Sequence, residues 1–375
     1  MYRVGRDVLA CLAMLDVRLP IGLFAMLGLA SCGAPLIESC VSTSDLQVDC
    51  RFSNPEDLAV SPNGEALLVS EYGSLARDRS GRLVAYRPRE VGGDGAIVPL
   101  FPIEGSAEAV AALSDPQRWG DPSCPRPTLS KFAPHGIDLE RLDSGEWALY
   151  VVTHGERESI EMFEVLTEPS LALRWRGCVE GPSGSNFNDV IVLRGGGFWV
   201  SQTFPRERNT VLAGLRMRYL GDTPGFVYRW DRASGFSAIP ATEVAYANGI
   251  EKSDDERFVF INAYFGNKLV KVDVERGERV GEVAVEGPDN VTWSAEGELL
   301  VASHLASTPD LLGCLNVTRG NCGFGFRILA IDPQRLTSRV LIEHRGPPMG
   351  AVTVALPFRG RLYLGTFAGD RIASR

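Results

Sequence analysis

Basic clusters are missing from this sequence. It has 38 lysines and arginines against 47 aspartates and glutamates, a formal net charge of −9, and no stretch in which positive charges gather. Proteins bind nucleic-acid backbones mainly through such stretches, so we exclude nucleic acid as a partner. The hydrophobic share of 45% and the charged share of 23% are those of a globular protein, which excludes a disordered chain.

Two signatures of common metal and hydrolase sites are also absent. No two cysteines have the Cys-x-x-Cys spacing of structural zinc sites. The Gly-x-Ser-x-Gly turn that exposes the nucleophile of many serine hydrolases does not occur either. What is abundant is glycine, with 40 residues, and proline, with 23, spread between β-branched and aromatic segments. This pattern predicts many short strands joined by turns.

The first 31 residues have the features of a secretion signal. Basic residues precede an apolar stretch at 20–30 that is too short to span a bilayer. The stretch ends in Leu29-Ala30-Ser31-Cys32, which resembles the lipobox of bacterial lipoproteins, whose cysteine is acylated. We therefore expect residues 1–31 to be a signal peptide and residues 32–42 to be a lipidated tether. The alternative is an ordinary cleaved signal in which Cys32 has no role.

Acylation of Cys32 predicts a protein attached to a bacterial membrane by its lipid. Gly33, and not an aspartate, follows the cysteine, which favours the outer membrane of a Gram-negative cell. We therefore expect a lipid-anchored protein of the cell envelope, on its periplasmic face. Residues 43–375 are expected to form a single domain.

The other cysteines predict disulfides, because an exported chain meets an oxidising compartment. Without Cys11 in the signal and Cys32 at the lipid site, an even number of six remains. Six cysteines allow 15 connectivities, so the pairing is open. The short loop between them favours Cys314 with Cys322. The other candidate pairs are Cys40 with Cys50 and Cys124 with Cys178.

One pattern occurs six times along the chain. Each copy has a short alternating strand, a turn with glycine, aspartate or asparagine, and a second apolar strand, and so predicts a β-hairpin. Insertions separate the copies, and the largest, at about 87–130 and 205–222, should be loops on the faces of the fold. Six hairpins predict an all-β fold, the six-bladed β-propeller. The copies are 57–72, 136–154, 189–203, 249–264, 290–304 and 351–367.

In a propeller the innermost strand of each blade lines the central channel. The residues at the start of each hairpin should therefore meet near the axis on one face. Five of the six copies carry a carboxylate, an amide or an imidazole there. The positions are Glu56-Asp57, Pro134-His135, Asn188-Asp189, Asn248, Asp289-Asn290 and Met349-Gly350.

A ring of carboxylate and amide oxygens without thiolates favours a hard cation. Calcium takes six to eight oxygen ligands in an adaptable geometry, whereas magnesium prefers a tight octahedron with retained water. The sequence therefore predicts calcium at the axis. The alternative is that each aspartate or asparagine caps its own turn. Buried carboxylates gathered without a cation would, however, repel one another.

The last residues of each hairpin should rim the same pocket, because the second strand returns to the face where the first began. Three of the four histidines, His135, His154 and His304, then fall on one face, and Gln202 joins them at the rim of the substrate pocket. The fourth, His344, lies in an expected outer strand. A single histidine is more often structural, but three together favour a functional site.

These residues lie in motifs that resemble the paraoxonase/arylesterase family. Its members are six-bladed propellers with two calcium ions that hydrolyse lactones and aryl esters. The motifs follow the family's order over nearly the whole mature chain. They are Pro55-Glu56-Asp57-Leu58, Pro62-Asn63-Gly64, Pro134-His135-Gly136-Ile137, Val151-Val152-Thr153-His154, Asn188-Asp189-Val190-Ile191, Ala247-Asn248-Gly249-Ile250, Asp289-Asn290-Val291 and Gly365-Thr366.

Carried over residue by residue, the resemblance implies two calcium sites and a histidine dyad. His135 and His154 would form the dyad that activates water, and His304 would be the third pocket histidine. The catalytic calcium would be bound by Glu56, Asn188, Asn248, Asp289 and Asn290. The structural calcium would be bound by Asp57, Asp189 and the carbonyl of Ile137.

The chain departs from the family near its end. The family closes its ring with a disulfide to a C-terminal cysteine, and no cysteine follows Cys322. Residues 287–297 also resemble the gluconolactonase/regucalcin family, which has a similar single metal site but does not rely on the dyad. The resemblance implies a calcium-dependent hydrolase of lactones or aryl esters. The alternatives are a sugar lactonase and a non-catalytic, calcium-stabilised binding protein of the envelope.

Overall fold

The computed structural model describes residues 35–75, 79–88, 95–103, 119–206, 209–315 and 317–375. Cys32 and the predicted signal segment 1–31 lie outside these residues. In the described ranges, no helix is both long enough and apolar enough to cross a membrane.

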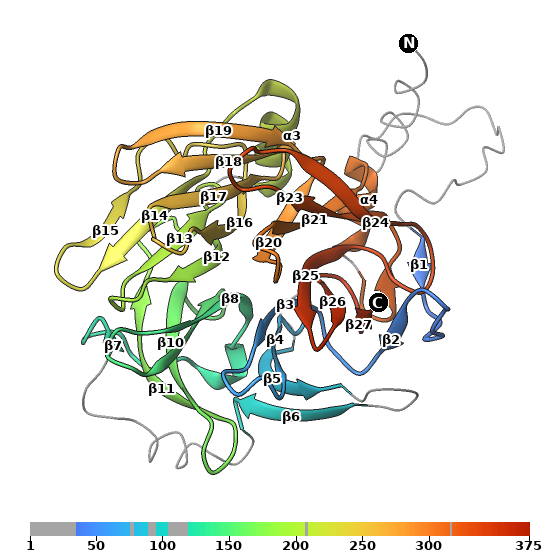
Figure 1. The fold of residues 1–375 in the computed structure, drawn as a ribbon, viewed down its shortest axis with the longest axis horizontal. Helices are drawn as coiled ribbons and strands as arrows, with labels where there is room; N and C mark the ends of the chain where they lie inside the picture. The colour runs from blue at the N-terminus through green and yellow to red at the C-terminus, as the bar shows by residue number, and fades with distance from the viewer. Residues whose placement is uncertain (1–34, 76–78, 89–94, 104–118, 207–208, 316) are drawn as a thin grey trace, which may run out of the picture.

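Six small sheets lie in a ring around a central axis (Figure 1). Each has four antiparallel strands, which follow chain order from the axis outward in five of the sheets, and one sheet gains a short parallel strand at its outer edge. In the remaining sheet the outermost strand comes from the N-terminal region. The described chain is therefore a six-bladed β-propeller, which confirms the fold class predicted from the six hairpins.

The first three blades run from residue 55 to residue 238. The first has β3 (Pro55–Val60), β4 (Leu67–Glu71), β5 (Arg82–Arg87) and β6 (Ala96–Phe101). The second has β8 (Pro134–Arg141), β9 (Trp147–Thr153), β10 (Ser159–Leu166) and β11 (Ala172–Glu180), with β7 (Trp119–Gly120) at its edge and the 3-10 turn η2 (Leu129–Lys131) before it. The third has β12 (Phe187–Val192), β13 (Phe198–Gln202), β14 (Phe226–Asp231) and β15 (Gly235–Ala238).

The other three blades complete the ring. The fourth has β16 (Ala247–Lys252), β17 (Phe258–Ala263), β18 (Lys268–Asp273) and β19 (Glu278–Ala284). The fifth has β20 (Pro288–Trp293), β21 (Leu299–Leu305), β23 (Gly325–Ile331) and β24 (Ser338–His344). The sixth has β25 (Val352–Phe358), β26 (Arg361–Thr366), β27 (Ile372–Ser374) and β2 (Gln47–Asp49).

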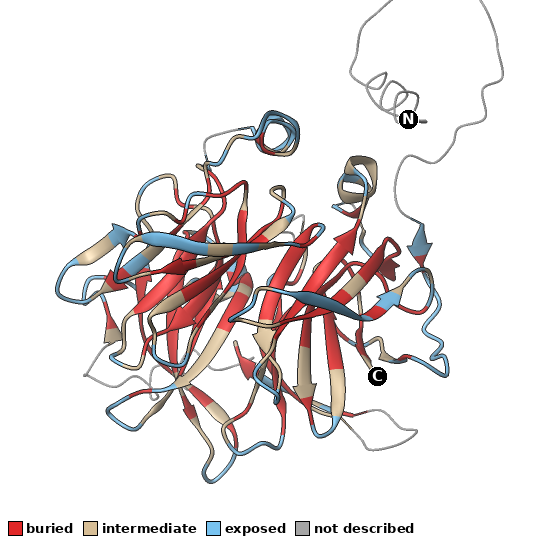
Figure 2. Ribbon diagram, turned by 45° about the horizontal axis from the view of Figure 1, so that its top comes forward, coloured by how far each residue is buried: buried red, intermediate tan, exposed pale blue. Residues whose placement is uncertain are grey.

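Both faces of a blade are apolar because each packs against a neighbouring blade. In β9, Leu149 and Val151 pack in the cluster shared with the first blade. The alternate residues Tyr150 and Val152 pack in the cluster shared with the third blade. This period of two places successive side chains on opposite faces of a strand, and full burial of each large apolar side chain is worth about 1.5–3 kcal/mol. The buried interior of the blades is visible in Figure 2.

Strand pairing between the N-terminal and C-terminal segments closes the ring, and no disulfide among the described residues joins these two segments. β2 from the N-terminal region pairs with β27, so it supplies the outer strand of the last blade. A second short sheet joins β1 (Leu36–Ile37) to β22 (Asn321–Cys322). β1 lies inside the segment 32–42 that the sequence predicts as a tether, and its Ile37 is buried against the propeller.

Arg371 fastens this closure. Its fully buried guanidinium donates to the backbone carbonyls of Ser39 at 2.7 Å, Pro348 at 2.9 Å and Ile37 at 3.1 Å, and it pairs with Asp370. We expect Arg371→Met to lower the free energy of unfolding by about 3 kcal/mol, because buried carbonyls lose their donors. Urea unfolding of this variant checks the expectation, with Arg375→Met, at an exposed arginine, as the control.

The structure confirms the three predicted disulfides. Cys40 pairs with Cys50, Cys124 with Cys178, and Cys314 with Cys322. Cys124–Cys178 spans 54 residues and so fixes the insertion before β8 to the outer strand β11.

Two helices interrupt the blades, and the first of them occupies the segment 205–222 that the sequence predicts as a loop. α3 (Thr210–Leu220) begins at Asn209, whose side chain accepts from the backbone N–H of Leu212, and ends at Gly221 in the left-handed conformation. α4 (Thr308–Cys314) begins with a capping box in which Ser307 and Asp310 bond reciprocally. Both helices stand on the same side of the ring in Figure 2.

Candidate active site

A β-bulge near the start of each innermost strand places the axial residues. The pairing register shifts there, which leaves one or two residues unpaired, and such bulges re-aim the side chains they contain. In five blades the unpaired residues include one or two of the axial residues predicted from the repeat, although Asp57 and Pro134 are themselves paired. The shifts fall between Pro55 and Asp57, Pro134 and Ile137, Phe187 and Val190, Ala247 and Ile250, Pro288 and Val291, and Val352 and Ala355.

The prediction for the sixth blade was wrong. Its bulge contains Thr353, not Met349-Gly350. Met349 is buried in the core of the last blade, and Thr353 donates to the backbone carbonyl of Glu56 at 2.6 Å.

Glycines after two axial residues allow the innermost strands to approach each other. A Cβ atom on Gly136 would lie 2.6 Å from the Cα atom of Asp189, and one on Gly249 would lie 2.5 Å from the Cα atom of Asn290. No side chain fits at such distances, so glycine here is a requirement of the close packing around the axis.

The five residues predicted to bind the catalytic calcium lie together at the axis, and all are buried. Asn248 donates to Asp289 at 2.7 Å, and Asn290 donates to Glu56 at 3.0 Å. Asn188 lines the same cavity as Glu56, Asn248 and Asp289. The six-fold repeat thus brings one structural position from separate blades to a single point.

We call these five residues, Glu56, Asn188, Asn248, Asp289 and Asn290, the axial cluster. Its two carboxyls, those of Glu56 and Asp289, are difficult to ionise in the absence of a cation. Burial raises the pKa of Asp289 from 3.8 to about 8, although the amide of Asn248 opposes the shift. Burial first, and then the charges of Asp57 and Asp289, raise the pKa of Glu56 well above its ordinary value. A bound cation would offset both effects.

The donors of the axial cluster fit one calcium ion. Oε2 of Glu56, Oδ1 of Asn248 and Oδ1 of Asn290 are buried and have no hydrogen-bond partner. Buried oxygens are rarely left in this state, and all three are hard donors of the kind that calcium prefers. Among the described residues, no group of three or more His, Cys, Asp or Glu side chains is arranged for a metal. The axial cluster has two carboxylates and three amides, so it is not a group of that kind.

The residues predicted for the structural calcium form contacts between blades. Oδ2 of Asp57 accepts from the backbone N–H of Ile137, and Oδ2 of Asp189 accepts from that of Ile250, both at 2.8 Å. Their Oδ1 atoms accept from the N–H of Leu58 and of Val190. Each carboxylate oxygen therefore has a donor, and the contact from Ile137 is made by its N–H. These residues show no open donor set, so a second calcium stays a prediction.

The predicted dyad is present beside the axial cluster. Nδ1 of His135 lies 2.8 Å from Nε2 of His154. Nε2 of His135 lies 3.6 Å from Oε1 of Glu56. His135 lines the cavity, whereas His154 is buried behind it. The ring of Tyr72 lies against both imidazoles, with centroids 5.6 and 5.8 Å away.

A carboxylate that the sequence reasoning missed lies behind the dyad. Oε1 of Glu158 lies 2.7 Å from Nδ1 of His154 and accepts from the backbone N–H of Phe187 at 2.7 Å. Oε2 accepts from Arg206 at 3.0 Å. Glu158 lies four residues after His154, in the loop between β9 and β10, where no periodic pattern marks it.

His304 lines the cavity as predicted, but both of its nitrogens have protein partners. Nε2 lies 2.9 Å from the carbonyl of Val352 and 3.2 Å from Oδ2 of Asp289, and Nδ1 lies 3.0 Å from the hydroxyl of Tyr264. Burial lowers the pKa of His304 from 6.5 to about 3. A neutral ring that donates to Val352 and accepts from Tyr264 holds Asp289 and Tyr264 in place.

The prediction that Gln202 belongs to the substrate pocket needs correction. Its amide nitrogen donates to the carbonyl of Phe204 at 3.0 Å, and its oxygen accepts from the backbone N–H of Asn186 at 2.9 Å. Gln202 is buried and does not line the cavity, because its side chain joins the backbone before β12 to the backbone after β13.

Above the axial cluster is a cavity of about 310 Å³ with mainly apolar walls. Helix α3 contributes Val211 and Leu215, and α4 contributes Leu311 and Leu312. Phe204, Tyr246, Tyr264, Phe265 and Phe367 complete the aromatic part of the wall. Its polar lining includes Glu56, His135, Asn188, Asn248 and Asp289 near the axis, and Thr210, Arg218 and Thr308 on the two helices. A few polar groups in an apolar pocket are the usual form of a small-molecule site.

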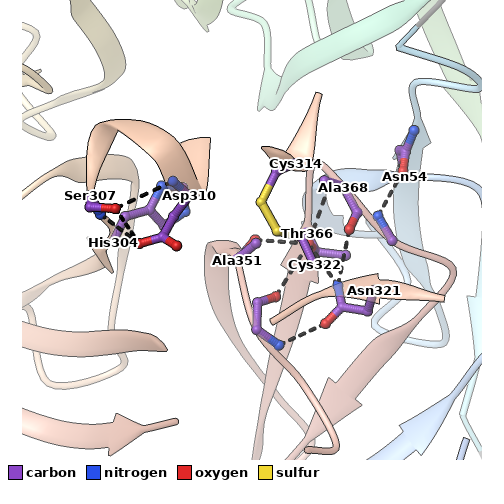
Figure 3. Close-up of a disulfide and its surroundings, with 12 residues drawn as sticks. Asn54, His304, Ser307, Asp310, Cys314, Asn321, Cys322, Ala351, Thr366 and Ala368 are labelled. Carbon is purple, nitrogen blue, oxygen red and sulfur yellow. Dashed lines mark hydrogen bonds between the residues drawn. A yellow bond between two sulfur atoms is a disulfide. The ribbon is translucent and has the colours of Figure 1, made fainter. Parts of the chain in front are cut away.

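The disulfide Cys314–Cys322 (Figure 3) anchors α4, whose Leu311 and Leu312 line this cavity. It joins the end of the helix to β22. Asn321 in β22 is itself held, because its side chain donates to Thr366 and to the carbonyl of Ala368, both at 3.2 Å, and accepts from the N–H of Gly350 at 2.7 Å. One wall of the cavity is thus attached to the last blade.

Known proteins resemble this chain at several levels. Part of it, 136 residues or 35% of the chain, is 29% identical to the Arabidopsis thaliana protein "STRICTOSIDINE SYNTHASE-LIKE 13", and the match spans 33% of that protein's length. A solved gluconolactonase from Xanthomonas campestris is 16% identical, with 92% of this chain and 95% of that chain covered and a TM-score of 0.48. Regucalcin, a calcium-binding protein from Agrobacterium tumefaciens, is 13% identical, with 84% and 82% covered and a TM-score of 0.44.

A family model described as "Arylesterase" matches residues 124–371, which is more than half of the chain. The match includes His135, His154 and four of the five axial cluster residues. The chain therefore belongs to the arylesterase family, which is the paraoxonase/arylesterase family that its sequence motifs resemble.

Proposed function

We propose that this protein hydrolyses lactones or aryl esters at His135 and the axial cluster, with one calcium ion bound by that cluster. The observation that carries the proposal is a line of contacts from the cavity into the protein. Nε2 of His135 faces Glu56, and its Nδ1 contacts the buried His154. Membership of the arylesterase family supports the same chemistry.

Glu56, Asn188, Asn248, Asp289 and Asn290 would hold the calcium ion. When bound, calcium polarises the substrate carbonyl and favours the negative charge that develops on its oxygen.

His135 acts as the general base in this proposal. Its Nε2 takes a proton from a water molecule, and the hydroxide oxygen bonds to the carbonyl carbon. The bond between that carbon and the ring or leaving-group oxygen then breaks, and this oxygen receives the proton back from Nε2. His154 holds the imidazole of His135 in place, and the apolar walls exclude other water from the reacting groups.

The cavity walls favour substrates with hydrocarbon groups over sugars. A sugar lactone presents several hydroxyls, each of which needs a hydrogen-bond partner when buried. Most wall residues, such as Leu215, Phe265 and Leu312, offer none. The helices add only Thr210, Arg218 and Thr308 as polar lining residues. We therefore place aliphatic lactones and aryl esters ahead of sugar lactones as substrates.

Hydrolysis of a substrate panel tests this proposal. We expect turnover of aliphatic lactones and phenyl acetate in calcium, little turnover of gluconolactone, and loss of activity on chelation, with circular dichroism confirming that the chelated protein stays folded. A folded, calcium-loaded protein that hydrolyses none of these compounds would instead indicate a binding protein.

We also propose that the protein works in the cell envelope, anchored by a lipid on Cys32. The support is the lipobox-like sequence together with the disulfides, which form and persist in an oxidising compartment.

A further inference from the structure

We infer that Glu158 is a positioning residue of this site, which fixes the proton positions of the histidine pair through His154. This inference rests on the proposed function for its effect on turnover. Glu158 does not line the cavity. Its side chain is 6% exposed and lies on the far side of His154 from His135.

The hydrogen bonds decide which nitrogen carries a proton. A carboxylate only accepts, so the 2.7 Å contact with Oε1 of Glu158 requires a hydrogen on Nδ1 of His154. A neutral imidazole has one N–H, so Nε2 of His154 is the acceptor in the 2.8 Å contact, and Nδ1 of His135 is the donor. Nε2 of His135, on the side of Glu56, is then its acceptor nitrogen. That is the nitrogen which has to take a proton from water.

The same contacts stabilise the protonated dyad. When Nε2 of His135 takes a proton, the positive charge lies one hydrogen bond away from His154 and two from Glu158. A buried carboxylate at the end of this chain favours that charge. Glu158 therefore acts through His154, and not on the substrate.

The carboxylate of Glu158 accepts hydrogen bonds from three donors. His154 and the N–H of Phe187 use Oε1, and Arg206 uses Oε2. Glutamine has only one acceptor oxygen, and its NH₂ group would face either Arg206 or the other two donors. Glu158→Gln therefore sets donor against donor in both orientations of the amide. Arg206→Met removes the donor on the Oε2 side, so in the double variant the amide oxygen is free to serve His154 and Phe187.

The number of donors around residue 158 predicts that Arg206→Met rescues part of the activity lost in Glu158→Gln. We expect Glu158→Gln to lower kcat by about 10- to 100-fold, as the loss of a partner that orients an imidazole does, with KM changed less than about threefold. Glu158→Gln/Arg206→Met should recover part of that loss, although it lacks the charge. Arg206→Met alone keeps the carboxylate and should stay within about threefold of the parent. Glu156→Gln is the matched control, because this carboxylate is 52% exposed and pairs with Lys131.

Nitrogen-15 NMR of histidine-labelled protein tests the inference without turnover. With only four histidines, the imidazole signals can be assigned by substitution. We expect a proton on Nδ1 of His154 in the parent and in the double variant, and its redistribution in Glu158→Gln. A parent without this proton, a Glu158→Gln variant with unchanged kcat, or a double variant no better than the single one would overturn the inference. If the parent hydrolyses no substrate, the proposed function fails, while the NMR result still decides whether Glu158 sets the tautomer.

Discussion

His135→Gln is expected to lower kcat for lactone and phenyl acetate hydrolysis by about 100- to 10,000-fold, the usual contribution of a general base. Glutamine keeps a polar side chain of similar reach that can donate to His154, but it cannot take a proton from water. His135 lines the cavity and lies outside the hydrophobic clusters of the blades, so its replacement should leave the fold intact. Initial rates over a range of substrate concentrations separate kcat from KM.

Two other histidines make this result interpretable. His344→Gln serves as the control, because His344 lies in β24 and contacts the carbonyl of Gly346, away from the cavity. His304→Gln should instead lower stability, because both of its nitrogens are bonded in the interior. A His135→Gln variant that kept the parent's kcat would remove the general base from the mechanism.

The axial cluster could be predicted from sequence because a propeller repeats one structural position. The residue type at a strand start can be read from the local sequence, and the ring geometry brings the starts of the six innermost strands together at the axis. The bulge in each innermost strand does the re-aiming, and in five blades it coincides with the polar residues. In the sixth blade the polar residue is Thr353, the third residue of the hairpin copy. It therefore does not lie at the strand-start position from which the other axial residues were predicted.

Glu158 and the cavity helices could not be found in the same way. The contact of Glu158 with His154 depends on the path of a non-repeating loop, and its other two partners come from the third blade and from the segment after β13. Helix α3 lies in an insertion and exposes several apolar side chains, among them Leu212 at 58% and Leu220 at 69%. It therefore lacks the two-sided polarity by which a surface helix is recognised.

Calcium is expected to stabilise this protein strongly. A ligand that binds only the folded state adds about 2.7 kcal/mol of stability at a concentration 100 times its Kd. The cluster offers such a site because Glu56, Asn248 and Asn290 each have an unpartnered buried oxygen. Thermal melting of the chelated protein, repeated with increasing calcium, should show a midpoint that rises with calcium concentration. Magnesium at the same concentrations should shift it less.

The calcium effect should increase with pH. In the metal-free protein the pKa of Asp289 is raised from 3.8 to about 8, so between these values the folded state binds a proton that the unfolded state has lost. Stability of the metal-free protein therefore falls as pH rises through this window. Calcium requires the ionised carboxylate, so its binding displaces that proton, at less cost at pH 8 than at pH 5.5. The rise in melting midpoint on calcium addition should be larger at pH 8.

Asp289→Asn separates the metal from the rest of the fold. The amide keeps the size of the side chain and removes its charge, so the metal-free variant should be at least as stable as the metal-free parent at pH 8, while its response to calcium should largely disappear. Asp273→Asn is the matched control, because Asp273 is buried and paired with Arg257 in the fourth blade. It should lower stability equally with and without calcium and keep the full calcium response. An Asp289→Asn variant that calcium stabilises as much as the parent would place the ion elsewhere than the axis.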